Sequence, residues 1–259
     1  MNNDMQKTAK IGAIVLAAGE GKRMQSKSVN KVTSTLGGKP LILHTVSLLE
    51  SLNIASVIIV VGFAKESVIS LLTDKKVIFA HQQKRLGTGH ALQFGFEKLP
   101  DEVTDVVVMG GDDSAFFTKK LVEELLLVHK NTSAVCTFLT INLDNPSGLG
   151  RVIRNEKGEV LAIVEERDAT DEQKEIHEIN SGIFIFSGIF LNEFLPTIEE
   201  SSITGEYYLV DLVRIAANNN KRIATVTKRN ISWRGINTQE ELEEAQKLFT
   251  QVQTEDAKS

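Results

Sequence analysis

The chain has 259 residues, of which 42% are hydrophobic and 24% charged, a composition typical of a globular protein with a sizeable core. Its net charge of −5 argues against non-specific binding of nucleic acid, so an anionic ligand needs a local cationic pocket. Cys136 is the only cysteine, which excludes an internal disulfide, and no apolar run reaches the roughly 18 residues of a membrane span. Met1–Lys10 is polar and lacks the apolar core of a signal peptide, so we expect a cytoplasmic protein.

Apolar, β-rich segments alternate with amphipathic segments through the first half of the chain. The first three strand candidates are nearly continuous apolar runs, as expected for parallel strands covered on both faces. The repeated strand–helix order predicts an α/β fold with a doubly wound sheet. We expect strands at Ile11–Ala17, Ser56–Gly62, Lys76–Ala80, Asp105–Met109 and Ala134–Ile141, and helices at Pro40–Leu52, Lys65–Thr73, Gly89–Lys98 and Thr118–His129.

After about Asn142 the pattern changes to α+β. No proline- or serine-rich linker separates the halves, so we expect the second part, 142–249, to pack onto the sheet of the first, 11–141. Residues 250–259 are polar and are expected to form a frayed tail. The expected elements are a hairpin of Gly150–Arg154 and Val160–Glu165, helices at Asp168–Ile176, Ile189–Glu193, Tyr207–Asn218 and Thr238–Phe249, and strands at Asn180–Ser187 and Arg222–Val226.

The most informative segment is the small-residue loop that follows the first strand, here called the opening loop (residues 17–24). Gly19 and Gly21 allow a ligand to approach the main chain closely, and the loop also carries two cations. Met24 stands where a dinucleotide fingerprint needs its third glycine, and Gly21-Lys22-Arg23 lacks the Ser or Thr of a Walker loop. A nucleotide site and an ordinary glycine turn with solvated cations therefore both remain open.

Two more loops that carry glycine and polar residues follow strands. Gln82–Gly89 follows the third expected strand, and Gly110–Asp113 follows the fourth. Ligands of open α/β sheets bind beyond the carboxyl ends of the strands, so these loops and the opening loop should meet at one edge. This convergence favours a binding site.

Asp112 and Asn237 are the candidate metal ligands. Asp112 follows the end of an apolar strand, where a carboxylate is well placed to hold Mg²⁺ over phosphates. The alternative interpretation of Asp112 is a residue that caps a helix or starts a turn. Asp113 could be the metal ligand instead. Asn237 could add a neutral oxygen, with a place near a helix N-cap as its alternative. Lys31 could reach a phosphate or be a solvated lysine.

Gln82, Gly87 and Thr88 offer the donors and acceptors needed to read a base edge. Thr88 could equally cap the helix that follows, and both roles are compatible. The histidines show no metal-binding spacing, and the chain has no H-E-x-x-H, no G-x-S-x-G and no Cys–His nucleophile pair.

Several motifs in this order resemble the sugar-1-phosphate nucleotidyltransferases, most of all the uridyltransferase (pyrophosphorylase) domain of bacterial N-acetylglucosamine-1-phosphate uridyltransferases. The resemblance covers Ile11 to Phe249. The first motif is shared widely and the later ones are more specific. They are Leu16–Met24 (LAAGxGxRM), Leu86–Ala91 (LGTGHA), Gly111-Asp112, Gly148–Val152 (GLGRV), Ile163–Glu165 (IVE), Asp168–Gln173 (DATDEQ), Glu178–Gly182 (EINSG), Gly205–Tyr208 (GEYY) with Asp211, and Gly235–Asn237 (GIN).

The resemblance implies a Rossmann-like, doubly wound mixed sheet of the nucleotidyltransferase (GT-A-like) type. It implies Mg²⁺-dependent transfer of UMP from UTP to N-acetylglucosamine 1-phosphate, giving UDP-N-acetylglucosamine and pyrophosphate. Carried over by position, the uridine would be held by Leu16, Ala17, Ala18, Gly19, Gln82, Gly87 and Thr88, the phosphates by Arg23 and Lys31, Mg²⁺ by Asp112 and Asn237, and the sugar by Gly150, Glu165 and Asn180.

The chain departs from the family pattern at a few positions. Asn30 stands in place of the usual proline, Gly110 of a tyrosine, Ser114-Ala115 of a proline-led turn and Val210 of a threonine. The exact sugar therefore stays open. Three alternatives to the implied function also stay open: a relative that uses another nucleotide, a nucleotide-sugar-binding protein without catalysis, and a glycosyltransferase with Asp112-Asp113 as its metal site. We expect none of the C-terminal left-handed β-helix that carries acetyltransferase activity in this family.

Overall fold

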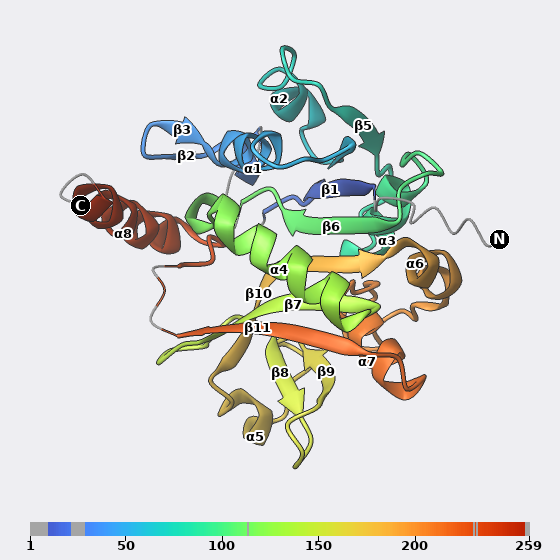
Figure 1. Cartoon of the computed structure of the whole chain (residues 1–259). Helices are drawn as coiled ribbons and strands as arrows, with labels where there is room; N and C mark the ends of the chain where they lie inside the picture. Colours follow the sequence, from blue (N-terminus) through green and yellow to red (C-terminus); the bar gives the residue numbers. More distant parts are fainter. Residues whose placement is uncertain (1–9, 22–28, 113, 230, 232, 257–259) are drawn as a thin grey trace.

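The computed structural model describes residues 10–21, 29–112, 114–229, 231 and 233–256. One mixed sheet runs through the molecule, with helices against both of its faces (Figure 1). Within these residues no helix combines the length and the apolar composition needed to cross a membrane. The expected α/β class and doubly wound arrangement are confirmed.

The strand order of the main sheet is β11-β7-β10-β6-β1-β4-β5, with the hairpin β8–β9 attached to β10. β1 pairs in parallel with β4 and β6, β4 with β5, and β7 with β11, whereas β10 is antiparallel to β6 and β7. The strands are β1 (Ile11–Ala17), β4 (Ser56–Val61), β5 (Ile78–His81), β6 (Asp105–Gly110), β7 (Cys136–Asn142), β8 (Arg151–Arg154), β9 (Val160–Val164), β10 (Glu178–Ser187) and β11 (Ile223–Arg229).

Side chains of β1 alternate between two buried clusters, one on each face of the sheet. Ile14 packs with residues of α3, α6 and α7, while Ala13 and Val15 pack with residues of α1, α2 and α4. This alternation explains why the strand reads as a continuous apolar run. The helices are α1 (Leu41–Glu50), α2 (Lys65–Ile69), α3 (Thr88–Phe96), α4 (Lys119–Thr132), α6 (Gly188–Phe194) and α7 (Asp211–Asn218), with 3₁₀ turns η2 (Lys31–Thr33), η3 (Ser114–Phe116) and η4 (Leu195–Thr197).

The second half of the chain completes the sheet of the first half. β10 lies between β6 and β7, and its Ile179 pairs with Arg151 at the start of β8. Three expected helices were too long by at least four residues, among them Lys65–Thr73, which is observed as α2 (Lys65–Ile69). α5 covers only Asp171–Lys174. It begins at Asp171 because Thr170 is its N-cap, with the Thr170 hydroxyl accepting from Gln173 N and the Gln173 side chain accepting from Thr170 N. α7 begins at Asp211, because Tyr207 bonds instead with the start of α3.

α8 (Gln239–Asp256) packs beside a short hairpin, β2 (Thr35–Leu36) and β3 (Lys39–Pro40), at the side of the molecule (Figure 1). Leu36, Leu41, Ile236 and Ala245 form a small apolar cluster there. The expected end at Phe249 was wrong, because the helix continues to Asp256 through residues 250–256 of the expected tail. Residues 257–259 lie outside the described residues. This packing brings the segment before α8, with Asn237, to the ends of the central strands.

Candidate active site

A cavity of about 860 Å³ opens where β1, β5 and β6 end. Every described residue that the sequence placed in the site lines it, so the predicted convergence of loops is confirmed. Arg23 and Asp113 lie outside the described residues. These lining residues are Leu16, Ala17, Ala18, Gly19, Lys31, Gln82, Gly87, Thr88, Asp112, Gly150, Glu165, Asn180 and Asn237.

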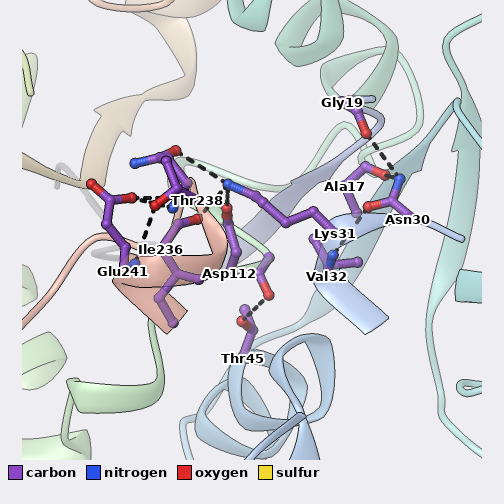
Figure 2. A network of polar contacts seen from close by, with 12 residues as sticks. Ala17, Gly19, Asn30, Lys31, Val32, Thr45, Asp112, Ile236, Thr238 and Glu241 are labelled. Carbon is purple, nitrogen blue, oxygen red and sulfur yellow. Dashed lines mark hydrogen bonds and ion pairs between the residues drawn. The ribbon is translucent and has the colours of Figure 1, made fainter. Parts of the chain in front are cut away.

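Lys31 places its ammonium group among three oxygen atoms. Its Nζ forms an ion pair with Asp112 Oδ2 and donates to Ile236 O at 2.7 Å and to Asn237 Oδ1 at 3.2 Å (Figure 2). The side chains of Lys31 and Asp112 are 14% and 11% exposed, so the pair is shielded from solvent. The lysine is therefore not a solvated surface cation.

This oxygen cage fits a divalent cation. A carboxylate, an amide oxygen and a main-chain carbonyl are hard ligands of the kind that Mg²⁺ prefers, and they already surround one positive charge. Within the described part of the chain, no group of three or more His, Cys, Asp or Glu could hold a metal. A metal held by Asp112 and Asn237 would thus take its remaining ligands from water and substrate phosphates.

Thr238, rather than Asn237, caps α8. Glu241 N donates to Thr238 Oγ1 at 3.1 Å, and Glu241 Oε2 accepts from the main-chain N–H groups of Thr238 at 3.1 Å and Asn237 at 2.5 Å. The side chain of Asn237 is therefore not used as the cap and turns to Lys31 instead. Asn237 thus lies next to the helix N-cap, as its alternative interpretation expected, while its side chain faces the cavity.

The loop after β6 is held against α1 by buried hydroxyl groups. Thr45 Oγ1 donates to Gly111 O at 3.3 Å and hydrogen-bonds with Ser114 Oγ. Ser114 is buried, so the serine that departs from the family pattern has a partner on the neighbouring helix. These bonds fix the position of Asp112 at the end of its strand.

Gln82 directly follows β5 and lines the cavity there with its side chain buried. Its Nε2 donates to Gly87 O at 3.1 Å and to His90 Nδ1 at 2.9 Å, which leaves Oε1 as an acceptor. Burial lowers the pKa of His90, while the charge of Glu97 acts in the opposite direction. Nδ1 accepts from Gln82 in the tautomer that carries its proton on Nε2.

Thr88 does not cap α3. Its Oγ1 accepts from Leu209 N at 3.0 Å, so it ties the start of α3 to the segment before α7. Gly87 is the N-cap residue, and as a glycine it has no side chain to cap the helix. The capping alternative for Thr88 was therefore wrong.

Gly150, Glu165 and Asn180 lie together at the other end of the cavity. Asn180 N donates to Gly150 O at 2.9 Å, and a Cβ on Gly150 would lie 3.6 Å from the Glu165 carboxylate. The side chain of Arg151 is buried next to this region, with only 1% of the residue exposed. It donates to Leu149 O and forms an ion pair with Glu166 at 2.7 Å. The motif Gly148–Val152 indicated that this loop belongs to the site, but it did not predict that the Arg151 side chain is buried.

Tyr208 lines this end of the cavity near three carboxylates. Burial raises the pKa of its phenol, a hydrogen bond with Thr204 opposes the shift, and the negative charges of Asp168, Glu206 and Glu165 raise it further. Carboxylates accept hydrogen bonds from hydroxyl and amide groups and repel phosphates. This end thus offers acceptors to hydroxyl or amide groups of a ligand, and Arg167 lines the cavity as well.

The model of the nucleotidyl transferase family matches residues 12–252, nearly the whole chain. The chain belongs to the nucleotidyl transferase family. It is 40% identical over 231 residues to the bifunctional protein GlmU of Caldicellulosiruptor saccharolyticus, covering 88% of this chain and 50% of that protein. It is 42% identical over 217 residues to the bifunctional protein GlmU of Francisella philomiragia, covering 84% and 46%.

The chain thus spans about half the length of the curated relatives it matches. Among solved structures, it is similar to a putative glucose-1-phosphate thymidylyltransferase from Bacillus anthracis in complex with sucrose. The TM-score is 0.73, with 22% identity and coverage of 92% of this chain and 95% of the other. This likeness agrees with the fold of this nucleotidyltransferase and with the expected α/β class.

Proposed function

We propose that this nucleotidyltransferase transfers UMP from UTP to N-acetylglucosamine 1-phosphate with Mg²⁺, releasing pyrophosphate. The observation that supports it best is the order of subsites along the sheet. Gln82 follows β5, Asp112 follows β6, and Asn180 lies on β10, in a sheet ordered β10-β6-β1-β4-β5. In this proposal the base, the phosphates with Mg²⁺ and the sugar would lie in that order along the sheet, which matches the order of these groups in a nucleotide joined to a sugar phosphate.

The reaction needs no protein nucleophile or general base. The sugar phosphate is already an anion near neutral pH, and its oxygen attacks the α-phosphorus of UTP while the bond to the leaving pyrophosphate breaks. In agreement with this, the described residues that line the cavity include no His or Cys. Positioning and neutralisation of charge can supply the rate enhancement.

The proposal assigns a role to five residues that line the cavity. Mg²⁺, held by Asp112 and Asn237, would neutralise charge on the phosphates. Lys31 lies beside the same oxygens and would hold a phosphate oxygen as a point charge. Gln82 would offer Oε1 to a donor on the base, and Glu165 would accept from hydroxyl or amide groups of the sugar.

A substrate panel tests the proposal. Nucleoside triphosphates are paired with sugar 1-phosphates in Mg²⁺, and pyrophosphate release is measured. We expect release with UTP and N-acetylglucosamine 1-phosphate; release only with another pair would reassign the substrates. Binding of UDP-N-acetylglucosamine without turnover in either direction would indicate a binding protein, and transfer of sugar without pyrophosphate a glycosyltransferase.

Asp112→Ala tests the cation site. We expect it to abolish Mg²⁺-dependent turnover while the protein stays folded, as measured by its melting temperature. Asp101→Ala, which removes an exposed carboxylate before β6, is the matched control and should keep wild-type turnover. Near-normal turnover in Asp112→Ala would remove this residue from the mechanism.

A further inference from the structure

Asn30 is a buried polar side chain beneath the opening loop, only 1% exposed. Its Nδ2 lies within hydrogen-bond distance of three carbonyl oxygens, those of Phe63 at 2.9 Å, Ala17 at 3.0 Å and Gly19 at 3.1 Å. Its Oδ1 accepts from Val32 N at 3.1 Å (Figure 2). Two amide protons are thus shared among three acceptors from two separate loops.

These bonds set the direction of the peptide groups in the loop. The C=O and N–H of a trans peptide point in opposite directions, and the described residues contain no cis bond. Because the carbonyls of Ala17 and Gly19 face the buried amide, the N–H groups of Ala18 and Glu20 face the opposite side. The Asn30 side chain therefore orients the N–H groups of both Ala18 and Glu20.

The cavity lies next to these groups. Residues 17–20 line it, and a Cβ built on Gly19 would meet no atom within 4 Å, so the loop borders open space. Main-chain N–H groups that face such a space can bind the oxygen atoms of a ligand.

We propose that Asn30 is a positioning residue for the nucleoside triphosphate. Its amide holds the carbonyls of Ala17 and Gly19 and so aims the N–H groups of Ala18 and Glu20 at the nucleotide. This inference rests on the proposed function, in which the opening loop binds the nucleotide. It predicts that loss of the amide weakens nucleotide binding and leaves the sugar phosphate end unaffected.

The backbone of Asn30 offers a substitution that isolates the side chain. Its φ of −73° and ψ of 145° are values that proline adopts without strain. Asn30→Pro therefore keeps the path of the chain and removes the amide. It also removes the N–H that donates to Ser67 Oγ at 3.1 Å, so Ser67→Ala is the matched control.

The test is calorimetric titration of the wild type, Asn30→Pro, Asn30→Ala and Ser67→Ala with UTP and other nucleoside triphosphates in Mg²⁺. We expect both Asn30 variants to bind nucleotide about tenfold more weakly or worse, with the KM for sugar 1-phosphate within about twofold of wild type. Ser67→Ala should leave both values near wild type. Equal losses in Asn30→Pro and Ser67→Ala, equal losses for both substrates, or no loss would overturn the inference.

A measurement on the wild type keeps the inference testable if the Asn30 variants do not fold. Saturation with nucleotide should shift the ¹⁵N–¹H amide resonances of Ala18 and Glu20, and unchanged resonances would overturn the inference. A wild type that binds no nucleotide in the panel would refute the proposed function and this inference together. Normal nucleotide binding by folded Asn30 variants would refute this inference alone.

Discussion

Gly87 stands at a backbone position that an alanine should not tolerate. Its φ of 102° and ψ of 178° lie in a region that is essentially restricted to glycine. A Cβ there would lie 2.5 Å from Tyr207 O and 2.8 Å from Tyr207 N, both main-chain atoms that cannot rotate away. Gly87→Ala should therefore push the segment before α7 off the start of α3.

The expected loss has two parts. The backbone strain costs about 1–3 kcal/mol. Displacing Tyr207 breaks its bonds with Leu86 O at 2.8 Å and Gly89 N at 2.7 Å, each contributing about 0.5–1.5 kcal/mol. A loss near the middle of the combined range, about 4 kcal/mol, would lower the melting temperature by roughly 8–16 °C for a chain of this size.

Thermal unfolding followed by circular dichroism measures this loss, and nucleotide titration shows whether the cavity wall has moved. Gly158→Ala is the control, because Gly158 also has a positive φ, 80°, but no atom lies within 4 Å of its Cβ position. The control should lose only about 1–3 kcal/mol from strain. If Gly87→Ala were no less stable than Gly158→Ala, the contact with Tyr207 would not carry the stability assigned to it.

Three other substitutions separate stability, cation binding and pH dependence. Gly19→Ala meets no atom within 4 Å, so its melting temperature should match wild type while calorimetry shows weaker nucleotide binding; an unchanged affinity would place the nucleotide elsewhere. Lys31→Met removes the ammonium from the oxygen cage, so Mn²⁺ measured by electron paramagnetic resonance should bind more tightly than to wild type, and weaker binding would contradict the shared site. Burial alone would raise the pKa of Glu178, but hydrogen bonds with Arg154 and Thr140 and the Arg154 charge hold it below its usual 4.5. Its contribution to stability is thus present above that value and lost as pH falls through the folded-state pKa. Urea unfolding from neutral pH to about pH 3 should show a flatter profile for Glu178→Gln, and equal slopes would refute this assignment.

Local patterns were sufficient for three strands of the first half, whereas β5 and β7 begin two residues later than expected and the hairpin β2–β3 was not predicted. β1 was predicted with its observed bounds, and β4 and β6 to within one residue, because continuous apolar runs have few other places to fold. Helix starts were harder to predict where a distant segment competes for the same backbone. The segment around Tyr207 reads as helix, yet it bonds with Leu86 and Gly89 because α3 begins beside it.

The sequence could name Lys31, Asp112 and Asn237 but not their arrangement. Their closeness depends on α8 packing beside β2, which brings a residue 206 positions away to within 3.2 Å of the lysine. The sequence did not predict that Asn30 and Arg151 are buried and make several hydrogen bonds each. Their partners are mostly main-chain carbonyl groups, which every residue type carries, so no pattern of residue types points to them.

The sequence by itself determined the α/β class and the three loops at the strand ends. It could do so because apolar periodicity and glycine placement act over short distances along the chain. Only the tertiary structure decided that Lys31 shares one oxygen cage with Asp112 and Asn237, and that Asn30 orients the peptide groups of the opening loop. Those contacts form between segments joined only by the packing of the sheet and helices, so no local pattern can encode their geometry.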